Sequence, residues 1–364
     1  MKDLLRVAAL LAGAAFFSAQ AADRASYTMG DYARVVKIDT HLHLHNPAPA
    51  FMAAAKRQNV KVLTINVDYP DFPPLDDQQR VAIELQKQFP QDLAWAASFS
   101  VDGSDKPEWL AATRQRIDGA MKAGAVGVKV WKNIGMSLKG ADGKLVMIDD
   151  ARFAPLFDDF AKQHIPLLGH QGEPHNCWLP LEQMTVNNDR EYFKAHPQYH
   201  MALHPEMPSW EAQMAARDRM VAAHPGLNFI GVHLASLERS VDELAAFLDR
   251  FPNATVDVAA RIGQLQYQSQ KDREHVRRFF IKYQDRILYG SDMSQAPDQD
   301  GAALAKEAEG VWRMHWRYFN TADSFKVADL DRPVKGLALP REVVDKIYHL
   351  NAERTFPGAW GGKR

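Results

Sequence analysis

Three histidines alternate with leucines near the start of the chain. The stretch IDTHLHLHN, residues 38–46, contains His41, His43 and His45. Side chains two positions apart on a β-strand point to the same face, so a strand here would direct the imidazole rings to one side. Imidazole nitrogens are common ligands of Zn²⁺ and related ions. The stretch therefore predicts part of a metal site and leaves open which two histidines bind the ion.

Further ionisable side chains stand near the ends of other short apolar runs. LLGH ends in His170, IGVH in His233 and LYGSD in Asp292, while GVKVW carries Lys129. A single histidine on a strand is usually a structural residue whose nitrogens are satisfied by neighbours. Four histidines and an aspartate in equivalent positions favour a divalent metal site, because imidazole and carboxylate groups together suit Zn²⁺ or a similar ion.

The elements that would position these residues alternate along the chain. Short apolar or β-branched runs predict strands, and polar stretches with apolar residues at three- and four-residue spacing predict helices between them. Eight strand–helix units predict a (β/α)8 TIM barrel in the α/β class, with its active site at the carboxyl ends of the strands. The predicted strands cover residues 34–40, 60–68, 93–101, 125–131, 165–170, 228–235, 254–260 and 286–292.

One connection is too long for an ordinary barrel loop. Between His170 and the next predicted strand lie residues 171–227, and we interpret about residues 174–208 as an insertion that forms a lid or pocket wall. Residues 302–364 are predicted to form a C-terminal helical tail. The mature chain, residues 22–364, is predicted to be a single domain.

Composition indicates a globular protein that acts on small molecules. Of 364 residues, 46% are hydrophobic and 24% charged, and the net charge of -1 excludes the large basic field that attracts nucleic acid. A charged start, the apolar run 7–17 and an Ala19-x-Ala21 motif predict a signal peptide, residues 1–21, with periplasmic or secreted localisation and no membrane anchor after cleavage. The single cysteine, Cys177, excludes an internal disulfide.

Five motifs, in chain order, resemble the amidohydrolase superfamily. They are IDTHLH, GVKVW, LLGHQGEP, IGVHLA and LYGSD, and they span roughly residues 35–293. Within the superfamily they are most similar to the amidohydrolase-related (amidohydrolase 2) branch of metal-dependent TIM-barrel hydrolases and decarboxylases. The ordered set of five motifs is specific, whereas the D-x-H-x-H pattern alone is only moderately so.

The resemblance implies a set of metal ligands. His41 and His43 would be the ligands from the first strand, His170 the ligand from the fifth and Asp292 the ligand from the eighth. In such families this aspartate contacts the metal-bound water and acts as its general base.

The resemblance also implies roles for the neighbours of these ligands. His233 would lie beside the metal, where it polarises the substrate or moves a proton. Asp39 would lie one layer deeper and orient ligands. His45 falls one step past the D-x-H-x-H frame and is interpreted as a residue at the mouth of the pocket.

Lys129 leaves the number of metal ions open. In binuclear relatives a lysine on the fourth strand is carboxylated and bridges two ions, with His170 and His233 both on the second. One ion is usual in the branch that this sequence resembles, and Lys129 would then hold a substrate carboxylate. Alternation with Val128 and Val130 predicts that Lys129 points into the barrel. We expect one divalent ion, Zn²⁺ or alternatively Mn²⁺.

Three further residues are weaker candidates for contacts with the substrate. Glu173 follows His170 by three positions and either lines the pocket or stabilises its loop. Arg261 follows the seventh strand and either binds an anionic substrate or forms a salt bridge with Asp257 or a carboxylate of the lid. Trp178 lies in the insertion and would belong to the wall of the pocket.

A second metal site is not expected in the insertion. His196, His200 and His204 have the four-residue spacing of ligands on one helix, but Pro197 and Pro205 interrupt any regular helix there.

The leading functional hypothesis is an exported metal-dependent hydrolase that cleaves an ester, lactone or amide bond of a small molecule with metal-activated water. The first alternative is a metal-dependent decarboxylase of a small carboxylic acid, with aromatic acids among the candidates. The second is a ligand-binding barrel without catalysis, although a purely structural zinc site would be closed by four protein ligands. Homo-oligomerisation is a further hypothesis, suggested by the apolar C-terminal segment. Substrate identity does not follow from the sequence, since specificity in this fold depends on its loops.

Overall fold

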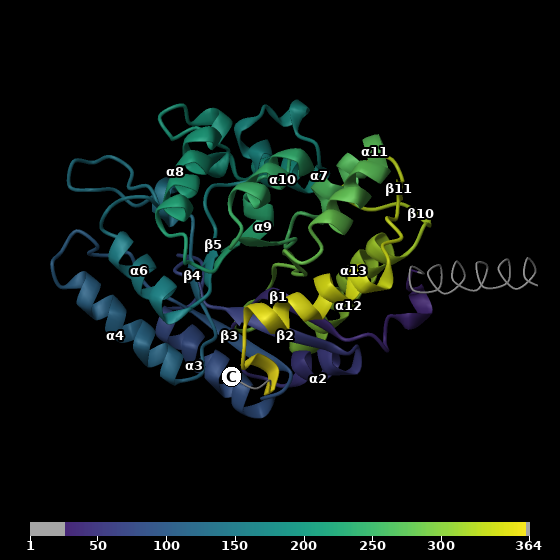
Figure 1. The fold of residues 1–364 in the computed structure, drawn as a ribbon, viewed down its shortest axis with the longest axis horizontal. Coiled ribbons are helices and arrows are strands. Elements are labelled where there is room, and N and C mark those ends of the chain that lie inside the picture. Colours follow the sequence, from purple (N-terminus) through teal and green to yellow (C-terminus); the bar gives the residue numbers. More distant parts are fainter. Residues whose placement is uncertain (1–25, 362–364) are drawn as a thin grey trace, which may run out of the picture.

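Parallel strands form a single curled sheet at the centre of the computed structural model, which describes residues 26–361 (Figure 1). The predicted signal peptide lies outside these residues. The sheet has the order β8-β7-β6-β5-β4-β3-β2-β1-β9. β8 pairs with β7 and β9 pairs with β1, so one short stretch of chain joins the two ends of the sheet. The strands are β1 (Lys37–Leu44), β2 (Val60–Ile65), β3 (Leu93–Ser98), β4 (Val128–Val130), β5 (Leu167–Gly169), β6 (Phe229–Gly231), β7 (Thr255–Asp257), β8 (Ile287–Leu288) and β9 (Met293–Gln295).

Helices follow the strands as a (β/α)8 barrel requires, which confirms the predicted fold. The main helices are α2 (Ala50–Arg57), α3 (Leu75–Gln88), α4 (Trp109–Lys122), α6 (Ala154–Gln163), α8 (Trp210–Ala223), α10 (Val241–Arg250), α11 (Ile262–Lys282) and α12 (Gly301–Asn320). Shorter helical turns are η1 (Met29–Asp31), α5 (Asn133–Met136) and α9 (Val232–Ala235).

Polar caps define where several of these helices begin. The Ser240 hydroxyl accepts hydrogen bonds from the first backbone N–H groups of α10, and Ser209 and Asp300 do the same for α8 and α12. Each cap satisfies a donor that has no partner inside the helix.

The core has two layers, one inside the barrel and one between strands and helices. Ile38, Leu63 and Leu168 belong to the inner layer, which Phe356 and Trp360 from the end of the chain also join. A much larger apolar cluster fills the space under the helices. The strands are therefore buried on both faces, which explains why their sequences are continuous apolar runs.

The segment between β5 and α8 is a compact unit of short helices. It contains η2 (His175–Trp178), η3 (Leu181–Gln183), α7 (Asn187–Ala195), η4 (Pro197–Tyr199) and η5 (Met201–Leu203). Cys177, Met184, Phe193 and Met201 form a small apolar core of its own. The insertion therefore presents a defined surface beside the barrel.

The C-terminal part is mainly helical, with a short antiparallel hairpin after α12. The hairpin consists of β10 (Ser324–Phe325) and β11 (Val334–Lys335), and α13 (Arg341–Asp345), η6 (Lys346–Leu350), α14 (Asn351–Thr355) and η7 (Ala359–Gly361) follow. No helix in residues 26–361 has both the length and the apolar character needed to cross a membrane.

Candidate metal centre

An irregularity in β1 determines where its histidines point. Asp39 pairs with Val62 on β2 while Leu42 pairs with Thr64, so the register shifts by one residue between Asp39 and Leu42. A bulge of this kind reverses the face that the following side chains occupy. Ile38, before the shift, packs inside the barrel, whereas Leu42 packs in the layer under the helices.

The shift places Asp39 and the two histidines on different faces. His41 and His43 line a cavity of about 220 Å³. Asp39 instead accepts hydrogen bonds from the indole N–H of Trp312 at 2.7 Å and the backbone N–H of Ser291 at 2.9 Å. Asp39 also accepts the backbone N–H of His41 at 3.2 Å, so it fixes the backbone of β1 and holds α12 and the segment after β8 against it. Its role in orienting the metal ligands stays a prediction.

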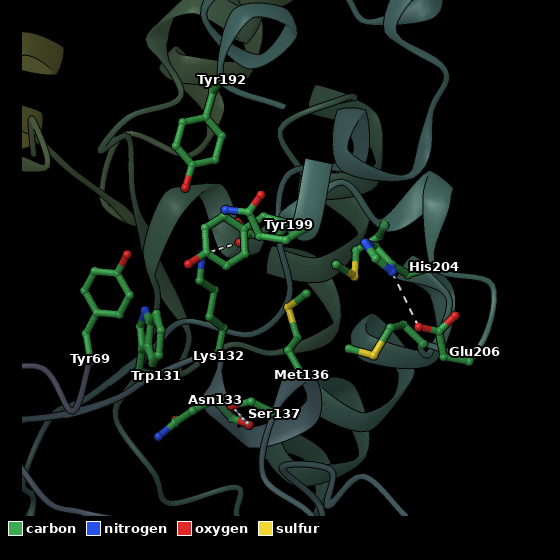
Figure 2. Close-up of a pocket in the computed structure, with 14 residues that line it drawn as sticks. Tyr69, Trp131, Lys132, Asn133, Met136, Ser137, Tyr192, Tyr199, His204 and Glu206 are labelled. Carbon is green, nitrogen blue, oxygen red and sulfur yellow. Dashed lines mark hydrogen bonds and ion pairs between the residues drawn. The ribbon is translucent and has the colours of Figure 1, made fainter. Parts of the chain in front are cut away.

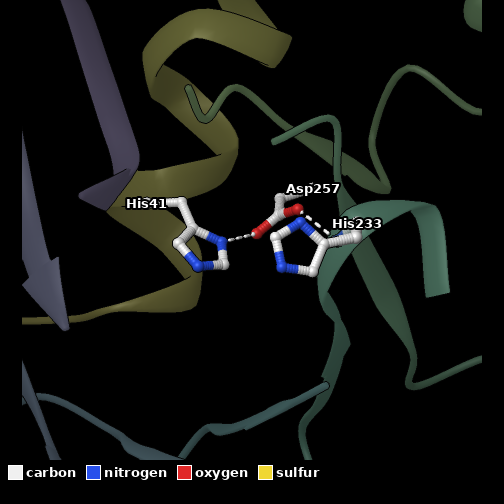
Figure 3. Close-up of side chains that lie close together, drawn as sticks. All are labelled: His41, His233 and Asp257. Atoms are coloured by element: carbon white, nitrogen blue, oxygen red, sulfur yellow. Dashed lines mark hydrogen bonds and ion pairs between the residues drawn. The ribbon is translucent and has the colours of Figure 1, made fainter. Parts of the chain in front are cut away.

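Asp257, at the end of β7, is the carboxylate that orients a histidine ring (Figure 3). Its Oδ2 lies 2.7 Å from Nδ1 of His41 and its Oδ1 accepts the backbone N–H of His233 at 2.6 Å. Burial favours the neutral acid, but His41, His233 and Lys129 outweigh it and keep the pKa of Asp257 below its usual value. The carboxylate is therefore an acceptor that fixes both histidines.

Acceptors behind the rings determine which nitrogen each histidine presents to the cavity. Nδ1 of His43 lies 2.8 Å from the carbonyl oxygen of Ile65, and Nδ1 of His233 lies 2.9 Å from that of Ala259. A carbonyl or carboxylate oxygen can only accept, so Nδ1 carries the proton in these rings and in His41. In this tautomer the Nε2 atom of each ring carries the lone pair, and that of His41 faces Nζ of Lys129 at 3.2 Å.

Asp292 lies in the short segment between β8 and β9, and its carboxylate faces the Nε2 atoms of His41 and His43. Its Oδ1 lies 3.2 Å from Nε2 of His41 and 3.4 Å from Nε2 of His43. Its backbone N–H donates to the carbonyl of His41 at 2.8 Å and its φ is 67°, a left-handed value that an aspartate adopts more readily than most residues. The turn between the two short strands thus aims this carboxylate at the histidines.

His233 lies in a strained turn directly after β6. His233, Leu234, Ala235 and Ser236 have φ values of 59°, 57°, 54° and 55°, and none of them is glycine. Left-handed backbone costs about 1–2 kcal/mol per such residue, so the surrounding contacts must enforce it. Asp257 contributes through the His233 N–H, and the Ser236 hydroxyl donates to the carbonyl of Gln171 at 2.9 Å. The turn brings the His233 ring to 4.8 Å from that of His41.

Lys129 and His170 complete the cavity from β4 and the end of β5. Nζ of Lys129 lies 3.2 Å from Nε2 of His41, so its side chain points inward as predicted. The ring of His170 lies 4.4 Å from that of His233. Nε2 of His170 is buried and has no hydrogen-bond partner among the described residues.

Charge states follow from this burial. Burial lowers the pKa of His41 below the usual value and those of His170 and His233 well below it. Burial would raise the pKa of Asp292, but His233, His41 and His43 hold it well below its usual value. Imidazole nitrogens beside an ionised carboxylate form a donor set that fits a divalent cation.

The structure brings three of the four predicted ligands into one group. Ligand atoms of His41, His43 and Asp292 lie within 4.8 Å of one another, as do those of His41, His233 and Asp257. His170 belongs to neither group, although it lines the same cavity. The ligand roles of all four residues, including His170, stay predictions.

The weaker candidates lie at different distances from this centre. Glu173 lines a neighbouring cavity and forms an ion pair with Lys132. Arg261 is buried, and in the described part of the chain it forms no ion pair with Asp257, whose partner is His41. Trp178 packs in the insertion, where its indole N–H donates to the carbonyl of Pro208 at 3.2 Å, and it does not line either cavity.

Two further expectations concern histidines. His45 is only 6% exposed and its ring packs 4.4 Å from that of Phe72, so the prediction that it lies at the mouth of the pocket is wrong. His196, His200 and His204 each face a backbone carbonyl oxygen, at 2.9, 2.7 and 3.0 Å. Within residues 26–361 they belong to neither of the two groups of candidate metal ligands.

Asp257 is the functional residue that the sequence argument missed. In the structure it ends β7, whereas the predicted strand covers residues 254–260 and places Asp257 in its middle, so the strand-end criterion does not select it. It was considered only as a partner for Arg261, and the tertiary contact with His41 spans 216 residues.

Comparisons with known proteins place the chain in a family. The family model described as amidohydrolase matches residues 38–358, whereas no curated protein matches.

Three solved structures of similar fold have low sequence identity. The 2,6-dihydroxybenzoate decarboxylase from Rhizobium has a TM-score of 0.49 and 16% identity, over 88% of this chain and 98% of its own. The 5-carboxyvanillate decarboxylase from Novosphingobium aromaticivorans has a TM-score of 0.48 and 12% identity, over 90% of this chain and 98% of its own. The L-hydantoinase from Arthrobacter aurescens has a TM-score of 0.47 and 15% identity, over 90% of this chain and 74% of its own.

The family model covers most of the chain, including every residue of the candidate centre. This protein therefore belongs to the amidohydrolase family of metal-dependent enzymes.

Proposed function

We propose that this protein is a metal-dependent hydrolase that cleaves an ester, lactone or amide bond of a small molecule. The observation that carries the proposal is the position of Asp292, whose Oδ1 lies within 3.4 Å of Nε2 of both His41 and His43. The same carboxylate is partly accessible, with 29% of its side chain exposed, and lines the cavity. A base at this place can reach both a metal ion and a water molecule that attacks the substrate.

One divalent cation, Zn²⁺ in our proposal, would be held by His41, His43, His170 and Asp292. When bound, such an ion polarises the substrate and lowers the pKa of a coordinated water toward neutrality. The Nε2 lone pairs of His41 and His43 face the cavity, and that of His41 also lies 3.2 Å from Nζ of Lys129. Nε2 of His170 is buried and has no hydrogen-bond partner among the described residues, which fits this assignment.

Asp292 is the residue that we expect to carry out both proton transfers. Asp292 is ionised at neutral pH, since its pKa lies well below the usual value, and it can accept the proton of the attacking water. His233 is neutral and carries its proton on Nδ1, facing the carbonyl of Ala259, so its Nε2 can accept a proton but cannot donate one. Return of the proton to the leaving group is therefore assigned to Asp292.

Decarboxylation is the second candidate, and Lys129 favours it. Its ammonium group is buried in the cavity beside His41, where it could hold a substrate carboxylate. Burial lowers the pKa of Lys129 to about 8, so it is mostly protonated at pH 7. In this reaction a carbon of the substrate would be protonated as carbon dioxide leaves.

One experiment separates the two reactions. The purified protein, loaded with Zn²⁺ or Mn²⁺, is incubated in H₂¹⁸O with panels of esters, lactones, amides and aromatic carboxylic acids. Hydrolysis places one ¹⁸O atom in the product. Release of carbon dioxide without ¹⁸O in the organic product would replace hydrolysis by decarboxylation.

The role of Asp292 is tested with a matched pair of variants. Asp292→Asn should reduce kcat by at least about 100-fold, the lower range for loss of a general base. Asp298→Asn, an exposed aspartate six residues further on, should retain wild-type activity. Unchanged turnover in Asp292→Asn, with metal bound, would refute the proposed mechanism.

Export and assembly are also proposals. Cleavage after Ala21 would deliver the mature chain to the periplasm or the medium. Amino-terminal sequencing of protein from the periplasmic fraction checks this, and a chain that still begins at Met1 would exclude it. Light scattering of the purified protein tests homo-oligomerisation.

A further inference from the structure

A second cavity, of about 360 Å³, is drawn in Figure 2, and it shares part of its wall with the cavity of the metal centre. We call it the outer cavity. Tyr69, Trp131 and Lys132 line both it and the cavity of the metal centre. These three residues come from the loops after β2 and β4, at the carboxyl ends of the strands. A molecule that reaches the metal centre can therefore extend along the same wall into the outer cavity.

Aromatic rings form much of the surface of the outer cavity. Tyr69 and Trp131 lie in contact, with ring centroids 4.6 Å apart. The insertion adds Tyr192 from α7 and Tyr199 from η4, which are 41% and 38% exposed, and Figure 2 shows the hydroxyl of Tyr192 directed toward the pocket. Large aromatic side chains seldom stay this exposed together around a cavity unless they bind something.

Methionines supply most of the remaining apolar surface. Met136, Met201 and Met207 line the outer cavity. Thioether groups are polarisable, adapt to irregular shapes and make favourable contacts with aromatic rings. The other lining side chains are polar: Lys132, Asn133, Ser137, Glu173, Gln198, His204 and Glu206. The combination of aromatic rings and thioethers favours an aromatic occupant, and a sugar ring is the competing occupant that the test below distinguishes.

The charges at the junction of the cavities are paired. Lys132 forms an ion pair with Glu173, and both residues line the outer cavity. On the far side His204 and Glu206 lie 3.5 Å apart. Because the lysine is already paired and Glu206 adds a second carboxylate, the outer cavity offers little to attract a carboxylate, which favours a neutral occupant over an anionic one.

We propose that the outer cavity binds a neutral aromatic ring of the substrate, joined to the group that reacts at the metal centre. The substrate class is then a molecule with a reactive ester, lactone, amide or carboxyl group at one end and an aromatic ring at the other. This inference rests on the proposed function for the inner part of the site, and it assigns specificity to Tyr192 and Tyr199.

Hydroxamates of increasing length test the inference. They chelate divalent ions and are not substrates for hydrolysis of an ester bond. Acetohydroxamate, benzohydroxamate and biphenyl-4-hydroxamate are titrated into the full-length zinc-loaded protein by calorimetry. The second ring should tighten binding relative to benzohydroxamate by about tenfold, as expected for aromatic contacts of about 1.4 kcal/mol.

Variants locate this gain. Tyr192→Ala and Tyr199→Ala should cancel most of the gain from the second ring and leave acetohydroxamate binding unchanged. Leu203→Ala is the matched control, since Leu203 belongs to the same insertion, is 58% exposed and does not line the outer cavity. It should retain the full gain.

Three results would overturn the inference. They are equal affinity for benzohydroxamate and its biphenyl analogue, an equal gain from a cyclohexyl group in place of the second ring, and a larger gain from a glucosyl group. Failure of acetohydroxamate to bind zinc-loaded protein would instead contradict the metal centre, so failure of the inference and failure of the proposed function are distinguishable.

Discussion

Replacement of Asp257 by asparagine should weaken metal binding although Asp257 is not expected to touch the metal. The asparagine oxygen can still accept the backbone N–H of His233, but its amide NH₂ then faces Nδ1 of His41. That nitrogen must become an acceptor, so the proton moves to Nε2, which faces Asp292. The lone pair that the metal ion needs is lost in the favoured tautomer.

The magnitude follows from the bond that is lost. The 2.7 Å contact between His41 and the Asp257 carboxylate is a charge-assisted hydrogen bond in a fully buried place. Such bonds contribute roughly 1.5–3 kcal/mol, and each 1.4 kcal/mol is a factor of about ten in affinity. Restoring the binding tautomer against the asparagine NH₂ should therefore lower metal affinity by roughly 10- to 100-fold, the range known for carboxylates behind ligating histidines.

The assay is competition for Zn²⁺ with a chromophoric chelator, with thermal unfolding as a check on folding. Asp39→Asn is the matched control, because Asp39 is equally buried but bonds to the Trp312 indole and to backbone N–H groups. It should lower stability and leave metal affinity near the wild-type value. Wild-type affinity in Asp257→Asn, or an equal loss in both variants, would refute the tautomer argument.

Three further predictions concern other buried groups. Burial raises the pKa of Glu238 from 4.5 to about 7. The contribution of its protonated carboxyl to folding stability is therefore fully present below pH 4.5 and is lost as the pH rises through 7. At 1.36 kcal/mol per pKa unit, this loss is up to about 3 kcal/mol. Urea unfolding at pH 5 and pH 8 should show a smaller loss in Glu238→Gln than in the wild type, and equal losses would exclude Glu238 as the cause. His170→Ala should lower zinc affinity by at least about 100-fold, more than loss of a supporting residue does, and unchanged affinity in the chelator assay would remove His170 from the ligand set. Lys129→Met should bind one zinc ion per chain, as the wild type should; two ions in the wild type and fewer in the variant by elemental analysis would establish a binuclear centre.

Much of the fold could be predicted because it depends on local patterns. All eight predicted strands are present, since strands buried on both faces are continuous apolar runs in the sequence. Their ends were less certain: β1 was expected to end at residue 40 and extends to Leu44. The inward direction of Lys129 followed from simple alternation with Val128 and Val130, because β4 pairs with its neighbours in regular register.

For the candidate centre, the sequence predicted most of the residues but not the direction in which each side chain points. Asp39, His41 and His43 have the spacing of residues on one face, yet the register shift in β1 turns Asp39 away from the histidines. That shift depends on how β1 pairs with β2, and the sequence of β1 alone does not reveal it. The sequence of β1 also does not reveal the position of His45, whose ring packs against that of Phe72.

By itself, then, the sequence determined the barrel, the chemical types of the residues at its carboxyl end and the kind of ion that they suit. Only the tertiary structure decided which carboxylate supports which ring, which nitrogen each histidine presents and how the turn at His233 is held. The physical reason is that apolar periodicity is a property of neighbouring residues, whereas a tautomer depends on an acceptor that folding brings close. For His41 that acceptor is Asp257, 216 residues further along the chain.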